Sequence, residues 1–118
     1  MPLVNVFTSA EPPPPDKADA LLLALSRSVA AELGKSESHV MTCLVPRTRM
    51  TFGGTLEPAC YVEVKSIGVM TPAQTSAISA VLCAHIADAL GVPQDRIYIE
   101  LADAEEHLWG WNGSTFAD

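Results

Sequence analysis

Apolar positions recur along this chain with two different spacings, and their alternation predicts its secondary structure. Residues 3–7, LVNVF, read as a strand with apolar side chains on both faces. Between residues 17 and 33 apolar residues return every three or four positions, which predicts a helix, and Gly34 suits the position just past its end. Residues 39–45, HVMTCLV, predict a second strand.

The same order of elements follows in the second half. Residues 60–67, CYVEVKSI, read as a strand, and TPAQ at residues 71–74 has the spacing of a capping box with proline at the first helical position. The helix that begins there ends at Gly91, and residues 96–101, RIYIEL, predict a fourth strand. The residues that this helix is expected to bury are Ile78, Val81, Leu82, Ile86 and Leu90.

Three segments between these elements read as irregular. Four consecutive prolines at residues 12–15 predict a stiff loop rather than a helix, with Asp16 as the N-cap of the first helix. Residues 46–58 form a turn region with two adjacent glycines. The tail, residues 109–118, is too rich in Gly, Asn and Ser for a helix.

An internal repeat relates the two halves. Residues 32–44 align with residues 89–101 without a gap, at a shift of 89 − 32 = 57, and the strands at 3–7 and 60–64 hold equivalent places. Each half is therefore βαβ, with a right-handed crossover and a parallel strand pair. The chain predicts one α+β domain, residues 1–118, with a four-stranded mixed sheet and both helices on one face. Nothing in the chain covers the other face, which predicts subunit association.

Composition limits the partners. The chain has 118 residues, 48% of them hydrophobic, and a net charge of −7, which disfavours nucleic acid and an acidic membrane surface as partners. Its three cysteines are odd in number and include no C-x-x-C, so a reducing, cytoplasmic compartment is expected. Neither a signal peptide nor an apolar run of about 18 residues is present. The histidines lack metal-ligand spacing, and neither a metal nor another cofactor is expected.

Pro2 raises a chemical question. A proline is tolerated at the first residue of a strand for structural reasons alone. If Met1 is removed, however, the Pro2 nitrogen becomes a secondary amine whose pKa, about 7.7–8.0 for an ordinary α-amino group, falls with burial or a nearby cation. Such a group is a useful general base near neutral pH. Lys35 could supply the cation, and Tyr98 and Glu100 should point to the uncovered face, where Pro2 also begins its strand.

Six segments carry a resemblance to a known family. MPLVNVF, LGKSES, MTFGGTLEP, KSIG, DRIYIE and GWNGSTF occur in this order over essentially the whole chain. Together they resemble the macrophage migration inhibitory factor family of the tautomerase superfamily, with a lean toward microbial members. The resemblance implies a homotrimeric barrel of βαβ–βαβ subunits with sites between subunits. It also implies an N-terminal proline that moves a proton in the keto–enol tautomerisation of phenylpyruvate and hydroxyphenylpyruvate.

The same resemblance implies roles for individual residues. Pro2 matches the catalytic proline, and Lys35 matches the lysine that pairs with the substrate carboxylate. Ile67 matches the residue whose backbone N–H holds that carboxylate, with Ser66 beside it, and Tyr98 matches a tyrosine contributed by a neighbouring subunit. The remaining substrate-binding candidates are Glu100, Trp111 and Phe116. A solvated lysine, and packing of the aromatic residues at a subunit contact, are the structural alternatives.

Three departures from the family pattern concern the site. Glu100 stands where the animal proteins have an asparagine, and a carboxylate there would repel an anionic substrate or, when protonated, donate a hydrogen bond, so altered specificity is expected. The animal C-x-x-C is absent, so a thiol–disulfide activity has no dithiol. His39 and Trp109 replace residues that several relatives have at the pocket rim.

Three functions remain in competition. The leading one is an isomerase, a keto–enol tautomerase acting on phenylpyruvate-like 2-keto acids with Pro2 as general base and acid. The rival is a cytokine-like protein that binds a receptor and keeps a vestigial pocket, which is compatible with non-classical secretion. A third is hydrolytic dehalogenation or decarboxylation, which typically needs arginines around the proline. No arginine of this chain lies at a matched site position.

Overall fold

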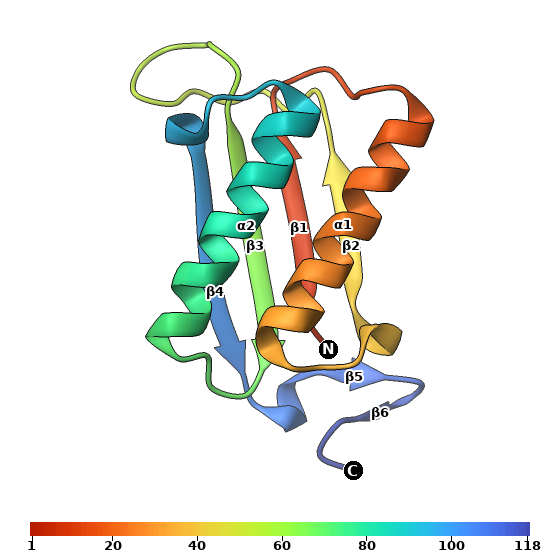
Figure 1. The fold of residues 1–118 in the computed structure, drawn as a ribbon. Coiled ribbons are helices and arrows are strands. Elements are labelled where there is room, and N and C mark those ends of the chain that lie inside the picture. The colour runs from red at the N-terminus through yellow and green to blue at the C-terminus, as the bar shows by residue number, and fades with distance from the viewer.

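Four strands form one sheet, and both helices lie on the same face of it (Figure 1). The structure is a computed structural model that describes all residues, 1–118. The strands are β1 (Leu3–Thr8), β2 (Met41–Val45), β3 (Cys60–Ile67) and β4 (Ile97–Ala104). The helices are α1 (Pro15–Leu33) and α2 (Pro72–Leu90), and a short tail ribbon consists of β5 (Gly110–Trp111) and β6 (Ser114–Thr115).

The strand order is β2-β1-β3-β4, and the pairing is mixed. β1 is parallel to β2, β3 is parallel to β4, and the two halves meet at the antiparallel pair β1–β3. The α+β architecture with two parallel pairs is thus confirmed. Because β1 and β3 run in opposite directions, the start of β1 and the start of β4 lie at opposite ends of the sheet (Figure 1).

The core lies between the sheet and the two helices. Alternate residues of the central strands are buried there, because successive side chains of a strand point to opposite faces. Of the five residues that α2 was expected to bury, Ile78, Leu82 and Ile86 are fully buried, and Val81 and Leu90 pack partly exposed at the edge of the core.

The start of α2 follows its sequence prediction. The Thr71 side chain accepts a hydrogen bond from the backbone N–H of Gln74 at 3.2 Å, and the Gln74 side chain accepts one from the backbone N–H of Thr71 at 2.9 Å. Pro72 is the first helical residue, and Gly91 ends the helix in the left-handed conformation. By length and composition alone α2 could cross a membrane. In this structure one face of α2 packs on the core through Ile78, Leu82 and Ile86.

Several predicted boundaries were wrong. α1 begins at Pro15 with Pro14 as its N-cap, so Asp16 is a first-turn residue and not the cap. A proline fits the first helical position because its missing N–H would have no helical partner there. His39 belongs to a 3₁₀ turn, Glu37–His39, that precedes β2, and Arg96 ends another such turn before β4. β4 also continues past the predicted end, to Ala104.

The repeat is offset by one residue at the first strands. The helices are related by 72 − 15 = 57, but burial starts at Cys60 in β3 and at Pro2 before β1, which corresponds to 60 − 2 = 58. The strand registers show the same offset. Leu3 pairs with Met41 and Tyr61 pairs with Tyr98, so the partner strands are related by 98 − 41 = 57 but the first strands by 61 − 3 = 58. The expected match of residues 3–7 with 60–64 was therefore wrong by one residue, because residues 3–7 correspond to residues 61–65.

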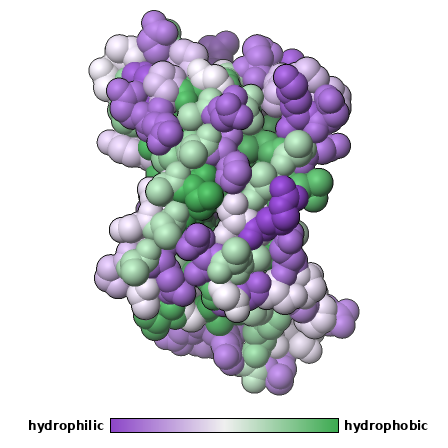
Figure 2. Space-filling view, viewed as in Figure 1, coloured by the Kyte–Doolittle hydropathy of each residue, from purple (hydrophilic) through white to green (hydrophobic).

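The two faces of the molecule differ in character. Figure 2 shows the helical face, over which hydrophilic side chains are spread and apolar ones occur in small patches. The opposite face of the sheet has no covering element within the chain and carries Leu3, Phe7, Tyr61 and Tyr98 among other side chains. The same face also carries Asn5, Glu63, Lys65 and Glu100, so it is of mixed character. A sheet face without a second layer is a typical association surface.

Candidate functional site

Pro2 is buried immediately before β1. Its carbonyl accepts the backbone N–H of Met41 at 3.0 Å, so it is anchored to the start of β2. The sequence predicted Pro2 on the uncovered face of the sheet, and this prediction was wrong. In the alternation of β1, Pro2 lies on the helical side with Val4 and Val6. The terminal amine of Met1 donates to the carbonyl of His39 at 2.6 Å. The amino terminus is therefore held in one place.

Lys35 reaches the end of β3 from the end of α1. Gly34 takes the left-handed conformation, and the Lys35 backbone N–H returns to the Ala30 carbonyl at 2.9 Å, which fixes the direction of the chain. The Lys35 ammonium then donates to Ser66 Oγ at 2.8 Å and to the Ile67 carbonyl. The three predicted carboxylate-binding residues thus lie together, with the Ile67 carbonyl facing the ammonium.

Two electrostatic effects act at this end of the sheet. Burial lowers the pKa of the Lys35 ammonium below its ordinary value. Burial, and secondly the positive charge of Lys35, lower the pKa of the terminal amine. No carboxylate forms an ion pair with Lys35. The ammonium is therefore a partly buried charge that only neutral oxygens hold, and it can receive an anion.

A pocket of about 490 Å³ opens beside the amino terminus. Its wall includes three aromatic side chains that pack on one another: the ring centroid of Trp111 lies 4.8 Å from that of His39 and 5.8 Å from that of Phe116. The full lining is Met1, Pro2, Leu3, Ser38, His39, Val40, Met41, Trp109, Gly110, Trp111 and Phe116. The tail ribbon β5–β6 therefore brings its predicted site residues to Pro2.

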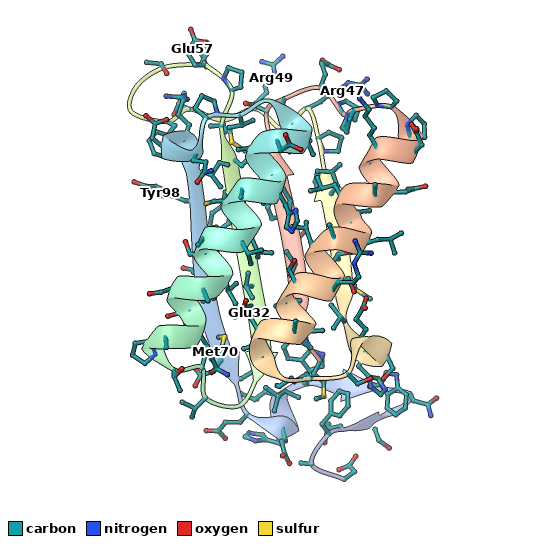
Figure 3. All side chains as sticks on the ribbon, viewed as in Figure 1. Glu32, Arg47, Arg49, Glu57, Met70 and Tyr98 are labelled. Carbon is teal, nitrogen blue, oxygen red and sulfur yellow. The ribbon has the colours of Figure 1, made fainter.

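Tyr98 and Glu100 lie elsewhere in the protomer. Both are exposed on the uncovered face, as predicted, and Tyr98 pairs with Tyr61, which in turn pairs with Phe7. Phe7 is five positions from Pro2, about 17 Å along the strand. Figure 3 shows Tyr98 near the start of β4, at the opposite end of the sheet from the tail. The structure brings Pro2, Lys35, Ser66, Ile67, Trp111 and Phe116 to one end and leaves Tyr98 and Glu100 out.

A second pocket, of about 600 Å³, surrounds Tyr98. The Phe52 ring lies 4.8 Å from the Tyr98 ring, and the Arg96 guanidinium lies over Phe52 and donates to three carbonyls of the turn region. The aromatic residues of this pocket are Phe7, Phe52, Tyr61 and Tyr98. Sequence reasoning missed Phe52 and Tyr61. The signal that could have found Tyr61 is the alternation of β3, in which Tyr61 lies between the buried residues Cys60 and Val62.

The hydroxyl of Tyr61, in this second pocket, contacts two carboxylates. It donates to Glu100 at 3.0 Å and lies 3.4 Å from Glu63. Burial and the neighbouring Glu100 carboxylate raise the pKa of Tyr61 to about 12, so its hydroxyl remains a donor at neutral pH. Glu63 also faces the Lys65 ammonium at 3.7 Å, whereas Glu100 has no cationic partner. No cluster of three or more metal-ligating side chains is present.

Comparison with known proteins identifies the family. Residues 1–117 match the model of the macrophage migration inhibitory factor family. The chain is 37% identical over 117 residues to macrophage migration inhibitory factor of Meriones unguiculatus, which covers 99% of this chain and 100% of the relative.

Solved structures agree. The macrophage migration inhibitory factor homologue from Prochlorococcus marinus is 50% identical with a TM-score of 0.90, over 97% of this chain and 98% of that one. The Toxoplasma gondii macrophage migration inhibitory factor also has a TM-score of 0.90, at 32% identity, over 97% of this chain and 99% of that one. The chain belongs to the macrophage migration inhibitory factor family and has the fold of the tautomerase superfamily.

Proposed function

We propose that this protein is a keto–enol tautomerase for phenylpyruvate-like 2-keto acids, with Pro2 as general base and acid after Met1 is removed. The observation that carries the proposal is the buried Pro2 at a strand start, where burial and the Lys35 charge already lower the pKa of the terminal amine. That amine belongs to Met1, and we expect burial and the Lys35 charge to act in the same direction on the Pro2 amine once Met1 is removed. A base with a pKa near the working pH is the most effective one for proton abstraction.

In the proposed reaction the substrate carboxylate lies against Lys35 and the backbone N–H of Ile67. The neutral Pro2 nitrogen takes a proton from the carbon beside the ketone. The electron pair of that C–H bond forms the C=C bond, and the carbonyl π electrons move to oxygen. The oxygen then takes a proton from protonated Pro2, directly or through a water molecule that accepts the Pro2 proton as it donates its own, so Pro2 ends the cycle neutral. Trp111 and Phe116 exclude water from the aryl group.

The complete site needs a second copy of the chain. Tyr98 and Glu100 are too far from Pro2 to join it within one protomer, and they lie on a sheet face that this chain leaves uncovered. We propose that the uncovered faces associate in a homotrimeric barrel, in which the Tyr98 end of one protomer meets the Pro2 end of the next. The strands at the edges of the sheet, β2 and β4, have free hydrogen-bonding groups for such contacts.

The test combines mass, assembly and turnover. Intact mass should show loss of Met1, and the wild-type protein should convert phenylpyruvate between its enol and keto forms with a rate that rises as the terminal amine loses its proton. Pro2→Gly should abolish most of that turnover while fold and native mass are kept, and Pro13→Gly, in the proline-rich loop, should leave it unchanged. Full turnover in a folded, assembled Pro2→Gly variant, or a retained Met1 in an active protein, refutes the assignment.

A second candidate function rests on the relatives' name. Proteins called macrophage migration inhibitory factor match this chain over its whole length. A cytokine-like role would require binding to a receptor ectodomain with unchanged affinity in Pro2→Gly, and an active tautomerase without such binding would exclude it.

For localisation we propose the cytoplasm, because all three cysteines are free thiols. Fractionation of the source cells tests this.

A further inference from the structure

We propose that Ser66 is a positioning residue: its hydroxyl holds the Lys35 ammonium at the end of β3, where Lys35 binds the carboxylate of the substrate. The inference deepens the proposed tautomerase site and rests on it for the substrate. Its structural part, the contact between the Ser66 hydroxyl and the Lys35 ammonium, stands on the geometry of this chain.

Ser66 is well suited to hold another side chain. It is 1% exposed and lies on the helical side of β3, close to where Lys35 arrives from the end of α1. The distance from Lys35 Nζ to Ser66 Oγ is 2.8 Å, and Ser66 Oγ lies 3.4 Å from the Ile67 carbonyl. Because the hydroxyl is enclosed, its main accessible partner is the ammonium, and substrate contact is left to Lys35.

The charge that Ser66 holds is not neutralised within the protomer. Five charged or titratable side chains are close to Lys35 or Ser66 in the sequence or pair with Ser66 across the sheet. They are Glu32 on α1, Glu37 and His39 on the 3₁₀ turn, Lys65 on β3, and Asp103, the register partner of Ser66 on β4. None of these makes an ion pair with Lys35, since Glu37 accepts from Ser26 and Lys65 faces Glu63. A partly buried ammonium held by two neutral oxygens keeps its full charge for an incoming carboxylate.

A lysine side chain that is free to move would bind the substrate carboxylate less tightly. It has four rotatable bonds and readily turns toward water, and such freedom costs binding energy each time an anion is captured. The Ser66 hydroxyl and the Ile67 carbonyl fix two of the three ammonium donors, and the third remains free. Without the hydroxyl, the ammonium can swing away from the amino terminus, which weakens its effect on the amine.

Three variants test the role. Ser66→Ala removes the hydroxyl, Ser66→Thr keeps it, and Thr8→Val removes an equally buried hydroxyl at the far end of β1, where it donates to the Ala59 carbonyl at 3.0 Å. Ser66→Ala should raise KM for phenylpyruvate about tenfold, as expected for the loss of one fixed charge-assisted contact, with a smaller change in kcat. Ser66→Thr should restore KM, and Thr8→Val should lower stability without changing KM.

A second readout does not need turnover. An NMR titration of protein labelled with ¹³C at its terminal residue follows the protonation of the amine directly. The midpoint should move to higher pH in Ser66→Ala, and stay in place in Ser66→Thr and Thr8→Val. If the wild-type protein is inactive, the proposed function fails while this titration still decides the role of Ser66. An unchanged KM together with an unchanged amine midpoint in folded Ser66→Ala overturns the inference.

Discussion

Replacing Lys35 by methionine tests the electrostatics of the proposed site most directly. Lys35→Met keeps an unbranched apolar side chain of the length of the lysine stem and removes the charged ammonium. An ammonium has three donors, and two of them already bind Ser66 Oγ and the Ile67 carbonyl. One donor remains for the substrate carboxylate. A hydrogen bond to a charged group contributes about 1.5–3 kcal/mol, so kcat/KM for phenylpyruvate should fall about 10- to 150-fold.

The pH profile should change in two ways. The Lys35 charge lowers the pKa of the terminal amine, so its removal raises that pKa, and the acid limb of kcat/KM moves to higher pH. Burial lowers the pKa of Lys35 itself, so in the wild-type protein its deprotonation should produce a falling alkaline limb. That limb should be absent in Lys35→Met, because no group remains there to lose a proton.

The assay is the absorbance change of enol–keto exchange across the pH range in which the folded variant is stable. Lys17→Met is the matched control, because Lys17 is exposed near the start of α1, at the other end of that helix. A variant that keeps the wild-type kcat/KM, or whose acid limb moves to lower pH, refutes the roles given to Lys35. A loss equal to that of Lys17→Met refutes them as well.

Three further substitutions and one comparison of thiol reactivity probe other parts of the structure. Thr71→Ala should lower stability by about 1 kcal/mol through loss of the α2 cap, measured by urea unfolding at fixed protein concentration, and an effect no larger than that of Ser76→Ala contradicts this. Because burial raises the pKa of Cys60 and of Cys83, both should react with a thiol reagent far more slowly at pH 8 in the folded protein than in denaturant; equal rates contradict this. Val45→Glu, on the uncovered face, should yield single chains in native mass spectrometry, whereas the exposed helical control Leu23→Glu should not; an intact Val45→Glu oligomer argues against association through this face. Glu100→Gln should lower KM for the anionic substrate about fivefold, and an unchanged KM removes Glu100 from the site.

Much of the fold was predictable because its signals are local. The TPAQ segment and the two helix-ending glycines depend only on neighbouring residues, and the structure has them where the sequence places them. The errors arose where a local preference had competing solutions. Asp16 is a good N-cap residue, but Pro15 can serve as the first helical residue, so the helix starts earlier.

The site was only partly predictable from the residues themselves. Pro2 and Lys35 are adjacent to a strand start and a helix end, so topology alone places them at one end of the sheet. Ser66 and Ile67 join them because β1 and β3 are antiparallel, which brings the end of β3 beside the start of β1. The contact of Trp111 with His39 depends on how the tail ribbon folds back, and no periodicity in the tail encodes that.

The internal repeat explains why one protomer has two different ends. By the registers, Cys60 stands in the second half where Pro2 stands in the first, and Val92 stands where Lys35 does, since 35 + 57 = 92. Cys60 and Val92 are both buried, so that end has neither a terminal amine nor a counterpart of Lys35. Its cation is Arg96, which lies over Phe52 and donates to backbone carbonyls, and aromatic side chains line the pocket there. A lone protomer therefore separates the proposed base at Pro2 from the pocket lined by Tyr98, Tyr61 and Phe52, which lies at the other end of the sheet. Its inactivity would follow from geometry even if it were perfectly folded, and activity should appear only where the unlike ends of two copies meet.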